Sequence, residues 1–92
     1  LTPLGVSAAS VNLDGRVVGG NARRAARAEI ITRNLETGED FRAVTNSFGY
    51  FRFENLPLGF YTIRVKQKNH ESAPQFLDLS EDRSNYLIFL TE

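Results

Sequence analysis

Residues 45–65 (TNSFGYFRFENLPLGFYTIRV) constrain the fold of this chain more than any other segment. Two groups of turn-forming residues, NSFG at 46–49 and LPLG at 56–59, are each followed by a run in which apolar and polar side chains alternate. A period of two is typical of a β-strand with one buried face, whereas a helix repeats every three to four residues. The segment therefore predicts strands at 50–54 and 61–65, joined by the turn at 56–59 as a β-hairpin.

The same alternation recurs in the rest of the chain, between turn signals spaced eight to twelve residues apart. It predicts five further strands, at 11–17, 28–33, 41–45, 75–79 and 85–90, and the turn at 46–49 would join 41–45 to 50–54 in a second hairpin. Seven short strands without a convincing helix predict an all-β fold, a seven-stranded antiparallel β-sandwich. Gly15, inside the first strand, is expected to mark a bulge or a close approach of another backbone.

Ninety-two residues are enough for one domain. Residues 1–10 (LTPLGVSAAS) combine Pro, Gly and small residues without a clear period, so we expect a linker or an extended N-terminal tail there, with the sandwich domain at 11–92. Leu4, Val6 and Ala8 alternate, however, and could form a strand of their own. The segment 19–27 (GGNARRAAR) is too short for a stable helix and is expected to be a loop with a basic rim.

The order of these segments from 11 to 90 resembles the carboxypeptidase regulatory-like domain, a transthyretin-like or prealbumin-like sandwich related to the B-type repeats of collagen adhesins. The most specific part is the pattern G-x-F-x-F-x-x-L-x-x-G-x-Y, met here by Gly49, Phe51, Phe53, Leu56, Gly59 and Tyr61. The resemblance implies a Greek-key sandwich and a non-catalytic module of secreted or bacterial surface proteins. The six residues themselves suit structural roles, because glycines form turns and aromatic rings fill the space between sheets.

The resemblance also raises the possibility of a covalent crosslink. Many B-type repeats carry a Lys–Asn isopeptide bond, which implies a Lys in the first strand, an Asn in the last and a Glu in the tyrosine strand. Asn85 is present here, but the first strand has no Lys and Val65 stands where the Glu would be expected. We therefore predict that this chain forms no isopeptide bond.

Composition removes several classes of function. Lys and Arg together number 11, as do Asp and Glu, so no net charge attracts nucleic acid or an acidic membrane surface. No run approaches the roughly 18 apolar residues of a membrane helix. The chain has no Cys, which removes disulfides and thiol catalysis. It also lacks Met, from which we expect a processed or excised piece of something longer. Because no membrane helix or signal peptide is apparent, we expect this piece to be soluble.

Catalytic and metal sites find little support in the sequence. His70 is the only histidine and lies in a polar segment, and its polar neighbours do not form a catalytic triad. Two acidic groups, Glu36/Glu39/Asp40 and Asp78/Glu81/Asp82, could bind calcium weakly, but neither has the spacing of an EF-hand loop, and solvated turns are the simpler interpretation. We expect no enzyme activity, no cofactor and no metal ion.

Two features point to interaction instead. The cations Arg52, Arg64, Lys66 and Lys68 fall on the polar faces of the two strands of the expected hairpin, where they would form a positive strip for an anionic glycan, or simply a solvated sheet face. The tail with Leu4 and Val6, and the closing strand at 85–90 that is apolar on both faces, suit β-strand addition between copies. We therefore expect an extracellular or cell-surface structural module that binds copies of itself or neighbouring domains. The alternative is a carbohydrate-binding or surface-ligand-binding accessory module of a larger secreted protein.

Overall fold

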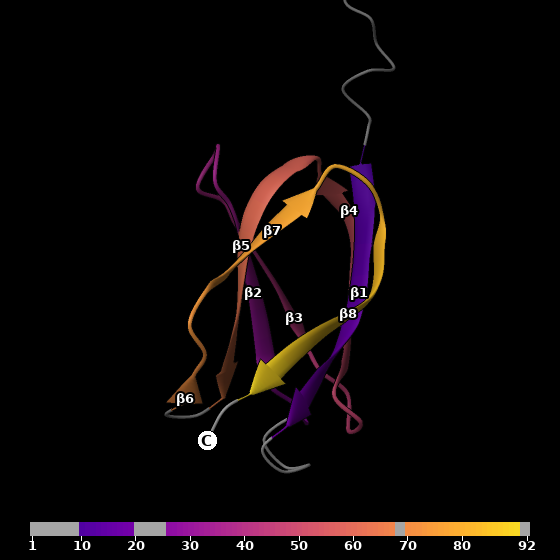
Figure 1. The fold of residues 1–92 in the computed structure, drawn as a ribbon, viewed down its shortest axis with the longest axis vertical. Coiled ribbons are helices and arrows are strands. Elements are labelled where there is room, and N and C mark those ends of the chain that lie inside the picture. Colours follow the sequence, from indigo (N-terminus) through magenta and orange to yellow (C-terminus); the bar gives the residue numbers. More distant parts are fainter. Residues whose placement is uncertain (1–9, 20–25, 68–69, 91–92) are drawn as a thin grey trace, which may run out of the picture.

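The computed structural model describes residues 10–19, 26–67 and 70–90, which form eight strands in two facing sheets (Figure 1). No helix occurs in these residues. The predicted all-β sandwich is therefore confirmed, with the two-residue strand β6 added to the seven expected strands. The bounds of the strands are β1 Ser10–Gly19, β2 Glu29–Asn34, β3 Asp40–Val44, β4 Tyr50–Pro57, β5 Gly59–Gln67, β6 His70–Glu71, β7 Gln75–Leu79 and β8 Arg83–Leu90.

One sheet has three strands in the order β4-β1-β8, and the other has the order β3-β2-β5, with β6 and β7 both pairing with the far side of β5. All of these pairs are antiparallel except β1 with β8, which run in the same direction. The sandwich has the expected Greek-key topology, and the chain changes sheet between β1 and β2, between β3 and β4, between β4 and β5 and between β7 and β8. The parallel pair departs from the purely antiparallel arrangement that the sequence predicted.

The two predicted hairpins within residues 45–65 and 41–54 are wrong. β4 pairs with β1 and β5 pairs with β2, so the turn after Pro57 carries the chain from one sheet to the other. Likewise, β3 pairs with β2, and the turn at 46–49 leads across the sandwich to β4. Alternation identifies the buried face of a strand, but either sheet would bury that face equally well. The partners of β4 and β5 are β1 and β2, which lie far from them in the sequence.

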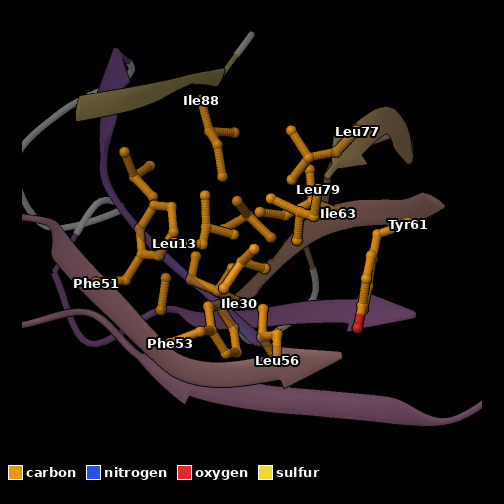
Figure 2. Packing of buried hydrophobic residues seen from close by; sticks show 14 residues of the cluster. Leu13, Ile30, Phe51, Phe53, Leu56, Tyr61, Ile63, Leu77, Leu79 and Ile88 are labelled. Atoms are coloured by element: carbon orange, nitrogen blue, oxygen red, sulfur yellow. The ribbon is translucent and has the colours of Figure 1, made fainter. Parts of the chain in front are cut away.

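Side chains from the inner faces of both sheets form a single core (Figure 2). The alternation predicted for β4 is observed, because Phe51 and Phe53 are buried while Arg52 and Glu54 are exposed. Burial of each large apolar side chain stabilises the fold by roughly 1.5–3 kcal/mol. The core contains Val11, Leu13, Val17, Ala28, Ile30, Phe51, Phe53, Leu56, Tyr61, Ile63, Val65, Leu77, Leu79 and Ile88.

Gly15 makes the parallel pairing of β1 with β8 possible. A Cβ atom at this position would collide with the carbonyl oxygen of Tyr86 and would lie 2.9 Å from Cζ of Phe51. The register between β1 and β8 also shifts between Leu13 and Gly15, opposite Asn85, which has a φ of 58°. The sequence-based expectation of a bulge or close backbone approach at Gly15 is therefore confirmed.

Candidate interaction surfaces

The six residues of the family pattern lie in the core and in its turns. Phe51 and Phe53 meet edge to face with ring centroids 6.1 Å apart, and Leu56 is buried beside them in the same strand. Gly49 has a φ of 88°, in the left-handed region that favours glycine, and its N–H donates to the carbonyl of Asn46. None of these residues presents a functional group to solvent.

Tyr61 combines a buried ring with a satisfied hydroxyl. Its side chain is 0% exposed, and the hydroxyl donates to the carbonyl oxygen of Pro57 at 2.7 Å. Burial raises the pKa of Tyr61 above its usual 10.0, since the charged phenolate would lose its water. This hydrogen bond ties the start of β5 to the end of β4, across the point where the chain changes sheets. Gly59, in that connection, has a φ of 148°.

Two buried polar residues outside the pattern also fix turns, and the sequence reasoning missed them. The side-chain oxygen of Asn34 accepts hydrogen bonds from the N–H groups of Glu36 and Thr37, at 2.8 and 3.0 Å. Thr45 is 2% exposed, and its hydroxyl accepts from the N–H of Ala28 at 2.8 Å. The Asn directly before the turn sequence was the available signal, because Asn side chains often bond the backbone two or three residues ahead.

The positive strip expected from the hairpin is divided between the two sheets. Arg52 lies on the outer face of the three-stranded sheet, whereas Arg64 and Lys66 lie on the outer face of the other, because β4 and β5 do not pair. Lys68, like Leu4 and Val6, lies outside the described residues. The prediction of a continuous positive strip through Arg52 and Arg64 is therefore wrong.

Several arginines on the two outer faces form ion pairs with carboxylates. Arg52 contacts Glu54 at 2.8 Å and Asp14 at 3.4 Å, and Nε of Arg64 lies 2.9 Å from a carboxylate oxygen of Glu71. On β2 and β3, the salt bridges are Arg33–Asp40, Arg42–Asp40 and Arg42–Glu29. These ion pairs reduce the attraction that the two faces offer to an anionic ligand.

Two of the acidic side chains singled out in the sequence contact other groups of the domain. Asp40 binds Arg33, whose hydrogen bond holds the pKa of this carboxyl below its usual 3.8, and Asp82 accepts the N–H of Asn12 at 2.9 Å. His70 lies in β6, where its backbone pairs with Gln67, and its side chain is not described. No group of three His, Asp or Glu side chains suited to a metal ion occurs in residues 10–19, 26–67 and 70–90. Nor does this part of the chain contain a helix that could cross a membrane.

Exposed aromatic side chains gather on the outer face of the five-stranded sheet. Phe60 on β5 and Phe76 on β7 are 50% and 64% exposed, and their rings stack with centroids 5.6 Å apart. Leu35, also exposed, donates its N–H to the carbonyl of Phe60. The sequence reasoning missed this aromatic pair. Phe60 has the same parity as Thr62 and Arg64, so its outward direction was available from the alternation.

A second apolar group lies on the outer face of the three-stranded sheet. Leu87 and Phe89 on β8 are 46% and 61% exposed, and their partners on β1 are Arg16 and Val18. The guanidinium of Arg16 lies 5.2 Å from the ring centroid of Tyr50, on β4. This face therefore has an apolar side along β8 and a charged side along β4.

The edge strands of the two sheets differ in charge. β8 forms one edge of the three-stranded sheet, and residues 84–90 of this strand carry no charged side chain. The opposite edge, β4, contains Arg52 and Glu54, and β3, the edge of the other sheet, contains Asp40 and Arg42. β6 and β7, beyond β5, contain Glu71 and Asp78.

These features agree with a known family. The family model of the carboxypeptidase regulatory-like domain matches residues 12–89. The chain belongs to the carboxypeptidase regulatory-like domain family. No curated protein matches its sequence.

Several solved structures share the fold of this carboxypeptidase regulatory-like domain. The Bacillus anthracis TIE protein superposes with a TM-score of 0.66 and 18% identity, over 88% of this chain and 16% of its own. A candidate carbohydrate-binding protein from Pseudomonas aeruginosa gives 0.63 and 11%, over 94% and 90%. A chain of a type II cohesin–X–dockerin complex from Acetivibrio cellulolyticus gives 0.54 and 21%, over 84% and 52%. At these identities the likeness is one of fold, and the domain corresponds to one part of the TIE and Acetivibrio chains.

Proposed function

We propose that this domain is a non-catalytic structural and interaction module that acts outside the cell and assembles with copies of itself. The tail of one copy, residues 1–9, would add as a strand to a sheet of the next copy. The observation that carries this proposal is the set of edge strands that, within the described part of the chain, pair on one side only, together with large exposed apolar side chains beside them. Membership of the regulatory-like family supports a role as a module rather than as an enzyme.

Removal of residues 1–9 tests this function directly. The full chain should form concentration-dependent oligomers, measured by size-exclusion chromatography with light scattering, and the shortened chain should remain a monomer. Removal of residues 1–3 alone is the control, because it leaves the alternation of Leu4, Val6 and Ala8 intact. The same distribution of oligomers for all three proteins would contradict self-assembly through the tail.

The aromatic pair Phe60 and Phe76 favours a second candidate function, carbohydrate binding. Flat exposed rings offer an apolar surface to the C–H face of a sugar, and polar groups such as Thr62 lie in the same region of the sheet. The Pseudomonas aeruginosa structure, itself a candidate carbohydrate-binding protein, lends this alternative some support. For this second candidate function, the glycan site that we propose is the aromatic pair rather than the positive strip predicted from the sequence.

A glycan array distinguishes the two candidates. Saturable binding of a glycan by the monomer, lost in the double variant Phe60→Ala/Phe76→Ala, would favour recognition of carbohydrate. Phe48→Ala is the matched control, since Phe48 is also exposed, at 70%, but lies in the turn at 46–49. No binding on the array, together with tail-dependent oligomers, would favour self-assembly.

The proposed place of action is the exterior of a cell or the bacterial surface. Family membership motivates this proposal. Protease treatment of intact producing cells tests it, because an exposed domain should be degraded without lysis. Protection in intact cells and loss only after lysis would contradict an external location.

A further inference from the structure

We propose that β8 is the strand that accepts the tail, so that residues 4–9 of a second copy pair with its free side. This inference rests on the proposed self-assembly and adds the site at which it occurs. It assigns the tail to one edge among those that the sandwich offers.

β8 lacks the features that usually prevent strand addition. Edge strands are commonly protected by charged residues, prolines or a short length. β8 is eight residues long, and residues 84–90 contain neither charge nor proline. Its one sheet neighbour among the described residues is β1. Beyond the shift opposite Asn85, residues 86–90 pair with β1 in regular register and provide an edge without a further shift.

The other edges are less suitable acceptors. An added strand on β3 would lie beside Asp40 and Arg42, whose salt bridges it would disturb or partly bury. On β4 it would lie beside Arg52 and Glu54, which are paired at 2.8 Å. Burial of such charges is unfavourable, and an apolar strand offers no polar or charged side chain to compensate for it. The uncharged edge of β8 imposes no such cost on the uncharged residues 1–9.

The side chains beside β8 match the two faces of the tail. On the outer face, Leu87 and Phe89 are exposed and would gain apolar contacts. On the inner face, the hydroxyl of Tyr86 reaches Gln75 of β7 at 3.1 Å, so little room remains between the sheets. The larger tail residues, Leu4, Val6 and Ala8, would therefore face outwards. The small residues Gly5, Ser7 and Ala9 would face the closed inner side.

Length favours a second copy over the same chain. Six residues extend about 20 Å, which exceeds the span of residues 86–90 at about 3.3 Å per residue. In its own chain, the tail would first have to cross from β1 to the far side of β8, two strand spacings or about 10 Å. This crossing would consume about three residues next to Ser10, including Ala8. A tail from another copy keeps all six residues for pairing.

Lysine substitutions on two edges test the site. The double variant Leu87→Lys/Phe89→Lys should weaken assembly at least about tenfold in light scattering, because lysine is a common means of blocking an edge strand. Val44→Lys is the matched control, since Val44 is 64% exposed on the edge strand β3, and it should change assembly by less than about twofold. Both proteins should keep the circular dichroism and melting behaviour of the parent.

Crosslinking locates the tail even if a lysine variant is unstable. The chain has no cysteine, so Val6→Cys in one copy and Leu87→Cys in another supply two unique thiols, both on the outer face of the proposed pairing. A bis-maleimide linker should join these copies efficiently, and it should join Val6→Cys to Val44→Cys poorly. A preference for Val44→Cys, or an intrachain link in a diluted Val6→Cys/Leu87→Cys double variant, would overturn the inference.

The outcomes separate this inference from the proposed function. If removal of residues 1–9 abolishes the oligomers but the β8 substitutions do not, self-assembly stands and the assignment of β8 fails. If removal of the tail leaves the oligomers unchanged, both the function and the acceptor edge are overturned.

Discussion

At the scale of single residues, buried polar groups fix the path of the chain more than they provide chemistry. The hydroxyl of Tyr61, the amide of Asn34 and the hydroxyl of Thr45 all bond backbone groups at turns. A buried polar group that lost its partner would cost free energy, so each bond favours one local conformation.

Tyr61→Phe removes one hydrogen bond while it keeps the ring. We expect the free energy of unfolding to fall by about 1 kcal/mol, because the carbonyl of Pro57 loses its donor. Denaturant unfolding followed by circular dichroism measures this change. Tyr50→Phe is the control, since the Tyr50 ring is half exposed, and its effect should be below about 0.5 kcal/mol. Equal losses in both variants would contradict the role assigned to Tyr61.

Asp40 should titrate below its usual pKa of 3.8, because Arg33 donates two hydrogen bonds to its carboxylate. The pKa in the folded state is lowered, so the contribution of this pair to stability is present above the pKa of the unfolded chain. It is lost as the pH falls through the lowered folded pKa. NMR titration of the carboxyl carbon measures the midpoint. Arg33→Gln should move it upwards, and an unchanged midpoint would contradict the pairing.

At the scale of strands, the sequence was sufficient to predict where the strands lie but not which strands pair with each other. Alternation located the strand at 50–54 and its buried Phe51 and Phe53, because the period of two is a local property. The pairing of β4 with β1 depends on residues about 40 positions away, so no local pattern could identify it. The aromatic pair Phe60 and Phe76 was hidden for the same reason, since β5 and β7 become neighbours only in the sheet.

Gly15→Ala should disrupt the junction between β1 and β8. The new methyl group would collide with a backbone carbonyl, which cannot move without separating the strands, so we expect a loss of about 2–3 kcal/mol. Gly38→Ala is the control, because its Cβ would meet nothing within 4 Å and only the φ of 79° opposes it, at about 1 kcal/mol. Thermal unfolding of both variants shows which substitution lowers the stability more. A smaller loss at Gly15 than at Gly38 would contradict the close approach.

The absence of an isopeptide bond remains a prediction, and the strand arrangement sharpens it. β1 and β8 are neighbours, so a Lys on β1 could reach an Asn on β8, but β1 contains no Lys. Val65 is 2% exposed and supplies no carboxyl group to the core. Intact mass spectrometry should therefore give the full sequence mass. A deficit of about 17 Da, the loss of ammonia, would contradict the prediction.

At the scale of the whole molecule, many surface charges lie beside charges of the opposite sign, whereas several large apolar side chains are exposed to solvent. The net charge is zero, and Arg33, Arg52 and Arg64 contact carboxylates on their own outer faces. Exposed ion pairs of this kind contribute little to stability. Among the described residues, the uncharged edge of β8 and exposed aromatic rings such as Phe60 and Phe76 are therefore the surface features that we assign to interaction.

Assembly through an uncharged edge should be insensitive to salt. Between about 0.1 and 1 M NaCl the Debye length falls from about 10 Å to about 3 Å, which weakens contacts between exposed charges. We expect the concentration at half assembly, measured by light scattering, to change less than about threefold. A steep loss of oligomers at high salt would instead indicate that paired charges hold the copies together.

The parallel pairing of β1 with β8 has a mechanical consequence. Because these two strands run side by side in the same direction, Ser10 and Leu90 lie at opposite ends of their shared ladder. A force that pulled the domain at these two positions would slide β8 along β1 and load the evenly spaced hydrogen bonds together. Antiparallel terminal strands with adjacent ends would open one bond at a time. The sandwich is therefore arranged to bear tension along its length.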